Sequence, residues 1–76
     1  MNGERNLTEL KVGDDATIAR IDSADDKILK KLMALGVLPG MKVVLLQKFP
    51  SYVIKVGNTR IAADEAIARS IIVVKK

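Results

Sequence analysis

Turn-forming residues divide this sequence into short apolar segments, and that division limits the fold more than any other feature of the chain. The interruptions fall at Gly13-Asp14-Asp15, Gly36, Pro39-Gly40, Pro50-Ser51 and Gly57-Asn58. The longest apolar run, residues 43–46, is far shorter than the roughly 20 residues that a membrane span needs. We therefore expect several short elements and no transmembrane helix.

Most of the segments between these turns have the composition of β-strands. The β-branched and apolar residues predict strands over residues 16–21, 41–49, 52–56, 59–62 and 71–74. Gly57-Asn58 is a two-residue hairpin signal. Pro39-Gly40 fits a type II turn, because proline fixes the first φ and glycine tolerates the positive second one. Residues 6–10 predict either a short turn of helix or a capped loop that sends Leu7 and Leu10 into the core.

One segment has a clear helical pattern. Ser23 is the expected N-cap, with Asp26 three residues later. Apolar residues follow at helical spacing: Ile28, Leu29, Leu32, Met33 and Leu35. Gly36 is expected to end the helix in a left-handed conformation, and Val37 is placed for the accompanying hydrophobic contact. A second, short helix is predicted over residues 64–70, just before the last strand.

The whole pattern predicts a mainly β protein of one domain. A chain of 76 residues is near the lower limit for independent folding. Five short strands cannot form two packed sheets, so we expect a strongly bent sheet that closes into a small five-stranded barrel and hides its edges. The helix would lie against one opening. We expect residues 1–6 to be a flexible N-terminus and residues 7–75 to be the domain.

The composition argues against catalysis and against tight metal binding. The chain contains no cysteine and no histidine, so the usual nucleophile–base pairs and the usual zinc and iron ligands are missing. Its carboxylate-rich region comprises Asp14, Asp15, Asp22, Asp25 and Asp26, but the spacing matches no EF-hand loop. Caps and turns explain most of these residues. We expect no catalytic residue, no metal ligand and no cofactor.

The charge balance is mildly basic. Thirteen Lys and Arg residues face nine Asp and Glu residues, which gives a net charge of +4. The positive residues are spread along the chain, and one Phe with one Tyr gives few platforms for base stacking. Nucleic-acid binding is therefore the alternative and not the expectation. The lysines at 27, 30 and 31 favour a solvated helix face or attraction to an acidic partner.

At this point the sequence resembles the FeoA family, the ferrous iron transport protein A family. Residues 32–40, Leu-Met-Ala-Leu-Gly-Val-Leu-Pro-Gly, are similar to its LxxLGxxPG signature. Upstream, Leu7, Leu10, Gly13, Ala16, Ile18 and Ile21 resemble the opening pattern of the family. Downstream, Ala62, Ala68, Ile71 and Val73 resemble its closing pattern. One departure is that Pro50-Ser51 runs almost directly into the next strand, where many members have a longer loop.

The resemblance implies an SH3-like barrel with an inserted helix, in a small cytoplasmic protein that is not an enzyme. It also implies a role in bacterial ferrous iron uptake, with the FeoB membrane transporter and its cytoplasmic GTPase domain as the partner. The same domain occurs in metal-dependent transcriptional repressors, so a regulatory domain that works with such a repressor is a further alternative. Direct insertion into the membrane is not expected.

The best candidate site is an apolar surface at the end of the helix. The apolar stripe is broad for a helix of three turns, so part of it is expected to stay exposed beside the Pro-Gly turn. An exposed apolar groove beside a helix is a common mode of peptide and protein binding. The predicted partner-binding residues are Leu32, Met33, Val37, Leu38 and Met41.

Overall fold

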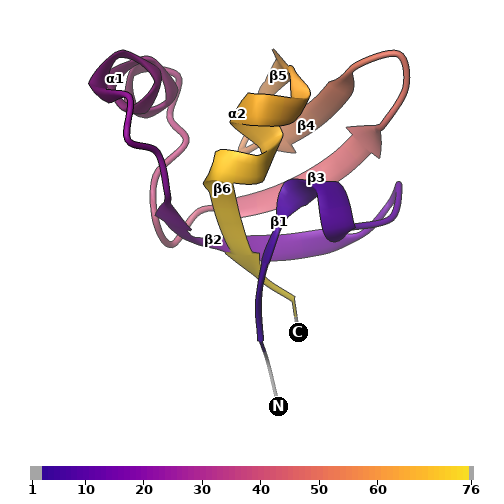
Figure 1. Ribbon diagram of the computed structural model, residues 1–76. Coiled ribbons are helices and arrows are strands. Elements are labelled where there is room, and N and C mark those ends of the chain that lie inside the picture. The colour runs from indigo at the N-terminus through magenta and orange to yellow at the C-terminus, as the bar shows by residue number, and fades with distance from the viewer. Residues whose placement is uncertain (1–2, 76) are drawn as a thin grey trace.

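The computed structural model describes residues 3–75, which form six antiparallel strands, two α-helices and one 3-10 turn (Figure 1). In chain order the elements are β1 (Glu4–Asn6), η1 (Leu7–Glu9), β2 (Asp15–Ile21), α1 (Asp26–Ala34), β3 (Lys42–Gln47), β4 (Tyr52–Val56), β5 (Thr59–Ala63), α2 (Glu65–Ser70) and β6 (Ile71–Val74). The predicted mainly β class is confirmed. Residues 1–2 of the expected flexible N-terminus lie outside the described residues.

The sheet has one strand more than the sequence predicts. Its order is β1-β6-β2-β3-β4-β5, and every neighbouring pair is antiparallel. The additional strand is β1, a polar segment within the expected N-terminal tail. It pairs with β6, with Glu4 opposite Val74 and Asn6 opposite Ile72. The prediction of five strands is wrong because a polar three-residue strand depends on its partner strand and has no apolar pattern of its own.

The sheet is bent, but its hydrogen bonding does not close into a barrel. Among the described residues the two edge strands, β1 and β5, do not pair with each other. Instead α2 packs against β5, β1 and η1 (Figure 1). Register shifts in β2 and β3 interrupt the ladders and allow the strands to bend. The predicted closed barrel is therefore not confirmed, and a helix occupies the region between the two edges.

A single core lies on the concave side of this sheet. Its fully buried large side chains are Leu7, Leu10, Ile18, Val37, Val43, Leu45, Ile54, Ile71 and Val73. Both leucines of the predicted N-terminal turn are among them. That turn is held by a capping box, in which the Asn6 side chain accepts a hydrogen bond from the Thr8 N–H. The Glu9 carboxylate in turn accepts one from the Asn6 N–H at 2.9 Å.

The main helix begins later than its sequence suggests. Its N-cap is Asp25, whose carboxylate accepts a hydrogen bond from the Lys27 N–H at 2.9 Å. The expected cap, Ser23, lies outside the helix, and its hydroxyl accepts a hydrogen bond from the Asp25 N–H at 3.1 Å. The later start leaves Ala24 outside α1 and makes Asp25 its cap, but Ile28, Leu29, Leu32 and Met33 all remain in the helix.

Candidate protein-binding site

Four large apolar side chains are exposed between the C-terminal end of α1 and the start of β3. They are Met33, Leu35, Leu38 and Met41, and between 37% and 48% of each is accessible to solvent. We call these four residues the helix–turn patch. In Figure 1, α1 stands to one side of the strands. The four residues lie within nine positions of the sequence, and exposed apolar residues of this size are candidates for protein binding.

The structure separates the predicted site residues into two groups. Leu32 and Val37 are 2% and 0% exposed, so they belong to the core and support the patch from below. A side chain with no accessible surface cannot contact a partner, so the prediction needs correction at these two positions. Met33, Leu38 and Met41 are on the surface, and partner binding by these three remains a prediction. The sequence analysis missed Leu35, because helical spacing assigned it to the buried stripe.

The end of α1 has a defined geometry that turns the chain toward the sheet. Gly36 adopts φ = +90°, a conformation that favours glycine. The Gly36 N–H donates to the Met33 carbonyl at 3.0 Å, and the Val37 N–H donates to the Leu32 carbonyl at 2.9 Å. These two bonds form a Schellman motif, with Val37 and Leu32 as its buried hydrophobic pair. The predicted helix stop and its hydrophobic contact are confirmed.

The following turn fixes the second half of the patch. The Met41 N–H donates to the Leu38 carbonyl at 3.1 Å, and Gly40 has φ = +92°, as a type II turn requires. Two further bonds attach this turn to β2. The Gly40 N–H donates to the Ile18 carbonyl at 2.7 Å, and the Ile18 N–H donates to the Met41 carbonyl at 2.8 Å. Leu38 and Met41 are thus held on a backbone that the sheet anchors.

Exposed lysines precede and follow the patch along the chain. Lys27, Lys30 and Lys31 are exposed on α1, and Lys42 is exposed immediately after Met41. Among residues 3–75, none of these four lysines lies within 4.0 Å of a carboxylate oxygen. The patch therefore combines apolar side chains with unpaired cations, a surface that complements an apolar and acidic one.

In the aspartate-rich region, carboxylates accept hydrogen bonds from backbone N–H groups and form ion pairs. The Asp14 carboxylate accepts hydrogen bonds from the Lys11 N–H at 2.9 Å and from the Lys75 ammonium at 3.0 Å. Asp22 lies 3.5 Å from the Arg20 guanidinium, and Asp25 caps α1. Within the described part of the chain, no three acidic side chains gather in a way that could hold a metal ion.

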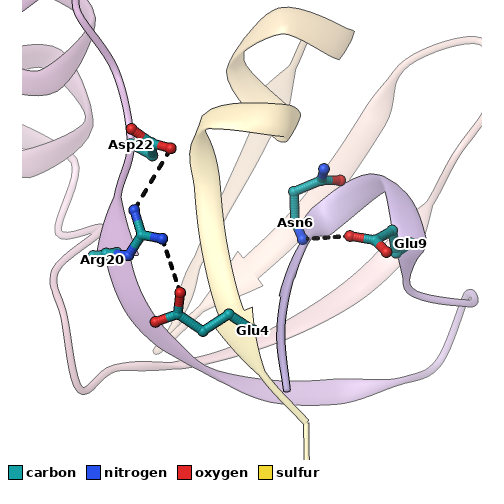
Figure 2. Close-up of polar contacts among 5 residues, drawn as sticks. All are labelled: Glu4, Asn6, Glu9, Arg20 and Asp22. Carbon is teal, nitrogen blue, oxygen red and sulfur yellow. Dashed lines mark hydrogen bonds and ion pairs between the residues drawn. The ribbon is translucent and has the colours of Figure 1, made fainter.

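Two of these carboxylates have a lowered pKa. The backbone N–H of Lys11, followed by the Lys75 ammonium, lowers the pKa of Asp14 below its usual value. A hydrogen bond from the Arg20 guanidinium, 2.8 Å away, lowers the pKa of Glu4. Figure 2 shows Arg20 placed between Glu4 and Asp22. In this view, Asn6 and Glu9 bond to each other on the other side of β6. The lowered pKa values mean that both carboxylates favour the folded state when they are ionised. Neither residue belongs to the helix–turn patch.

The surface also has two hollows. One, of about 80 Å³, is lined by Asp15, Ala16, Thr17 and Lys42. The other, of about 220 Å³, is lined by Glu4, Arg5, Asn6, Glu9, Arg20 and Ile72. In the larger hollow both carboxylates already bind neighbours, the Arg20 guanidinium and the Asn6 N–H. In the smaller hollow, among the residues that the structure describes, no hydrogen bond joins the Thr17 hydroxyl to Asp15 or Lys42.

Fold and surface together define a small SH3-like β domain that displays an apolar patch beside a helix. The FeoA domain model matches residues 5–75, and the chain belongs to the FeoA family, which is linked to ferrous iron transport. No curated protein is similar enough in sequence to count as a match. The matched region includes most of β1, which the resemblance in the sequence placed outside the domain.

Solved structures agree with this assignment. The iron uptake regulatory protein FeoA superposes with a TM-score of 0.85 at 26% identity, covering 97% of this chain and 99% of that one. The Stenotrophomonas maltophilia FeoA, complexed with zinc and described as an SH3 domain protein, superposes with a TM-score of 0.80 at 28% identity, covering 90% and 87%. The T. acidophilum repressor IdeR superposes with a TM-score of 0.89 at 26% identity, covering 97% of this chain but 35% of IdeR.

Proposed function

We propose that this protein is a cytoplasmic, non-catalytic accessory protein of bacterial ferrous iron uptake. Its partner would be the cytoplasmic GTPase domain of a FeoB-type membrane transporter. Membership of the FeoA family supports the link to iron transport. No helix within residues 3–75 has the length and apolar character needed to cross a membrane. A role in transport would then depend on contact with a membrane-embedded partner.

The observation that carries the proposal is the exposure of the helix–turn patch, whose turn is hydrogen-bonded to β2. Met33, Leu38 and Met41 are each more than a third exposed, whereas the residues beneath them are buried. Apolar contacts would supply most of the binding free energy, and the lysines of α1 would mainly increase the association rate with an acidic surface. The protein would assemble or regulate the transporter by docking.

A direct test measures binding of the purified protein to the recombinant GTPase domain by isothermal titration calorimetry. Leu38→Glu places a charge in the patch without disturbing the core, and we expect a loss of binding of at least about tenfold. Phe49→Glu is the matched control, because Phe49 is 86% exposed at the opposite end of β3. Normal binding by a folded Leu38→Glu variant would remove the patch from the interface.

We also propose that the protein does not itself carry iron. The whole chain lacks histidine and cysteine, and ferrous iron favours sites that include imidazole or thiolate. Anaerobic titration with Fe²⁺ should therefore show no stoichiometric binding in the micromolar range. Stoichiometric micromolar binding would contradict this proposal without affecting the docking surface.

A second candidate function is favoured by the similarity to IdeR, of which the chain spans about a third. In this alternative, the protein is a separate regulatory domain that works with a metal-dependent repressor. Titration with a repressor that lacks its own SH3-like domain, with and without operator DNA, separates the two. Binding to the repressor but not to the GTPase domain would favour the alternative, and salt-sensitive binding to DNA alone would indicate a nucleic-acid-binding module.

A further inference from the structure

The two edges of the sheet differ in how their backbone groups are satisfied. β1 is three residues long, and the Asn6 N–H bonds to the Glu9 carboxylate (Figure 2). β5 is five residues long, and among residues 3–75 it pairs with no strand except β4. An edge strand with unpaired backbone groups is a template for another strand. Although α2 contacts β5, Arg60 and Ala62 on this strand are exposed, so β5 is the edge at which the sheet can be extended.

The β4–β5 hairpin determines which backbone groups point outward. Val56 and Thr59 close a two-residue loop in which Gly57 has φ = +60°. In such a hairpin the closing residues exchange hydrogen bonds, and bonded pairs then alternate with non-bonded ones. Arg60 and Ala62 fall in non-bonded pairs, so their N–H and C=O groups point away from β4. No other backbone group within residues 3–75 bonds to them, and both residues are exposed.

The side chains at this edge are positive and small. Lys55 lies opposite Arg60 in the register, and neither has a carboxylate within 4.0 Å among the described residues. Asp15 lies in the same cross-strand row, beyond Val44, and forms an ion pair with neither cation. The methyl group of Ala62 leaves room beside Arg60 for a longer side chain on an added strand.

We propose that the β5 edge binds an extended acidic segment of another protein as a seventh strand. The segment would pair with the N–H and C=O groups of Arg60 and Ala62, and its carboxylates would face Arg60 and Lys55. A second copy of this chain is a poorer occupant. Pairing of β5 with itself would bring two Lys55–Arg60 rows together, and like charges destabilise such contacts. The surface differs from the helix–turn patch, so the two proposals can fail separately.

The test uses the full-length protein and a fluorescein-labelled short peptide that alternates Glu and Val, with a Gln-for-Glu peptide as comparison. We expect saturable binding of the Glu peptide, weaker binding of the Gln peptide, and slower hydrogen exchange of the Arg60 and Ala62 amides. Slower exchange requires main-chain pairing, which attraction between charges alone does not produce. Peptide-induced protection elsewhere, or none at these amides, would overturn the proposal.

Variants at one position separate backbone pairing from charge. Ala62→Pro removes an outward N–H that makes no bond to β4 and should weaken binding about tenfold, whereas Ala62→Val keeps the N–H and should bind like the wild type. Arg60→Glu should also weaken binding of the Glu peptide. Wild-type affinity in a folded Ala62→Pro variant would overturn the proposal. Protection of Arg60 and Ala62 that increases with protein concentration, without peptide, would assign the edge to a second copy instead.

Discussion

The two helices of this protein have the same kind of N-cap but differ in how much of each is buried. Each has an aspartate N-cap, Asp25 in α1 and Asp64 in α2. α2 has six residues, yet it buries Ala68 and Ser70 and packs against η1, β1, β5 and β6. α1 has nine residues and a stronger apolar pattern, yet its buried residue is Leu32 alone. Length and amphipathic pattern therefore do not decide which helix is structural.

The reason lies in what each helix covers. α2 occupies the region between the two edge strands, where its loss would expose core residues to water. α1 follows β2 at one corner and returns through the turn to β3, so its apolar side chains exceed the surface available to bury them. A helix with unburied apolar side chains is suited to binding, and a helix that seals a core is suited to stability.

The largest expected difference is in the free energy of unfolding, when one large side chain is shortened near α2 and another in α1. Leu7→Ala opens a cavity in η1, which packs against α2, and should lower the free energy of unfolding by about 2–5 kcal/mol. Met33→Ala, on the exposed side of α1, should change it by at most about 0.5 kcal/mol. Urea unfolding of both variants measures this, and equal losses would contradict the proposed division of roles.

A smaller effect is expected from removing the two helix caps. The Asp64 carboxylate accepts a hydrogen bond from the Ile67 N–H at 2.8 Å. Asp64→Ala removes this bond and should lower the free energy of unfolding by about 1 kcal/mol. Asp25→Ala should instead speed hydrogen exchange within α1 and leave exchange in the sheet almost unchanged, because α1 can loosen locally. Amide exchange followed by NMR distinguishes the two patterns. A uniform increase across the sheet in Asp25→Ala would show that α1 is part of the cooperative core.

The smallest effect concerns pH. The folded protein lowers the pKa of Glu4 and of Asp14, so both carboxylates favour the folded state when they are ionised. Their contribution is present above the unfolded pKa and is lost as the pH falls through about 4 and below. Glu4 lies in β1 and Asp14 lies immediately before β2, so this part of the acid-induced loss of stability should come from the sheet. Thermal unfolding between neutral and acidic pH measures this loss, which should be smaller in Asp14→Asn.

Local chemistry made much of the fold predictable. Gly36, the Pro39-Gly40 turn and the Gly57-Asn58 loop each require a backbone conformation that few residues adopt, so their roles could be assigned without a structure. The apolar spacing also identified α1 and most strands. In contrast, β1 could not be predicted, because its pairing partner, β6, lies at the other end of the chain.

The candidate site was predictable only in outline. Five apolar residues near Gly36 were expected at a surface, and three of them, Met33, Leu38 and Met41, are there. Helical spacing places residues on a face but does not say how wide the covering surface is. The Schellman motif buried Val37 with Leu32, and the end of α1 at Ala34 left Leu35 exposed. Packing of the helix end against the sheet decided these positions.

The sequence by itself determined the short strands, the helix stop, the turns and the lack of imidazole and thiol chemistry, because each depends on residue type or on near neighbours. The tertiary structure alone decided that the sheet stays open, that α2 lies between its edges and that α1 remains displayed. These outcomes depend on which apolar surfaces meet, and contacts between distant segments set them.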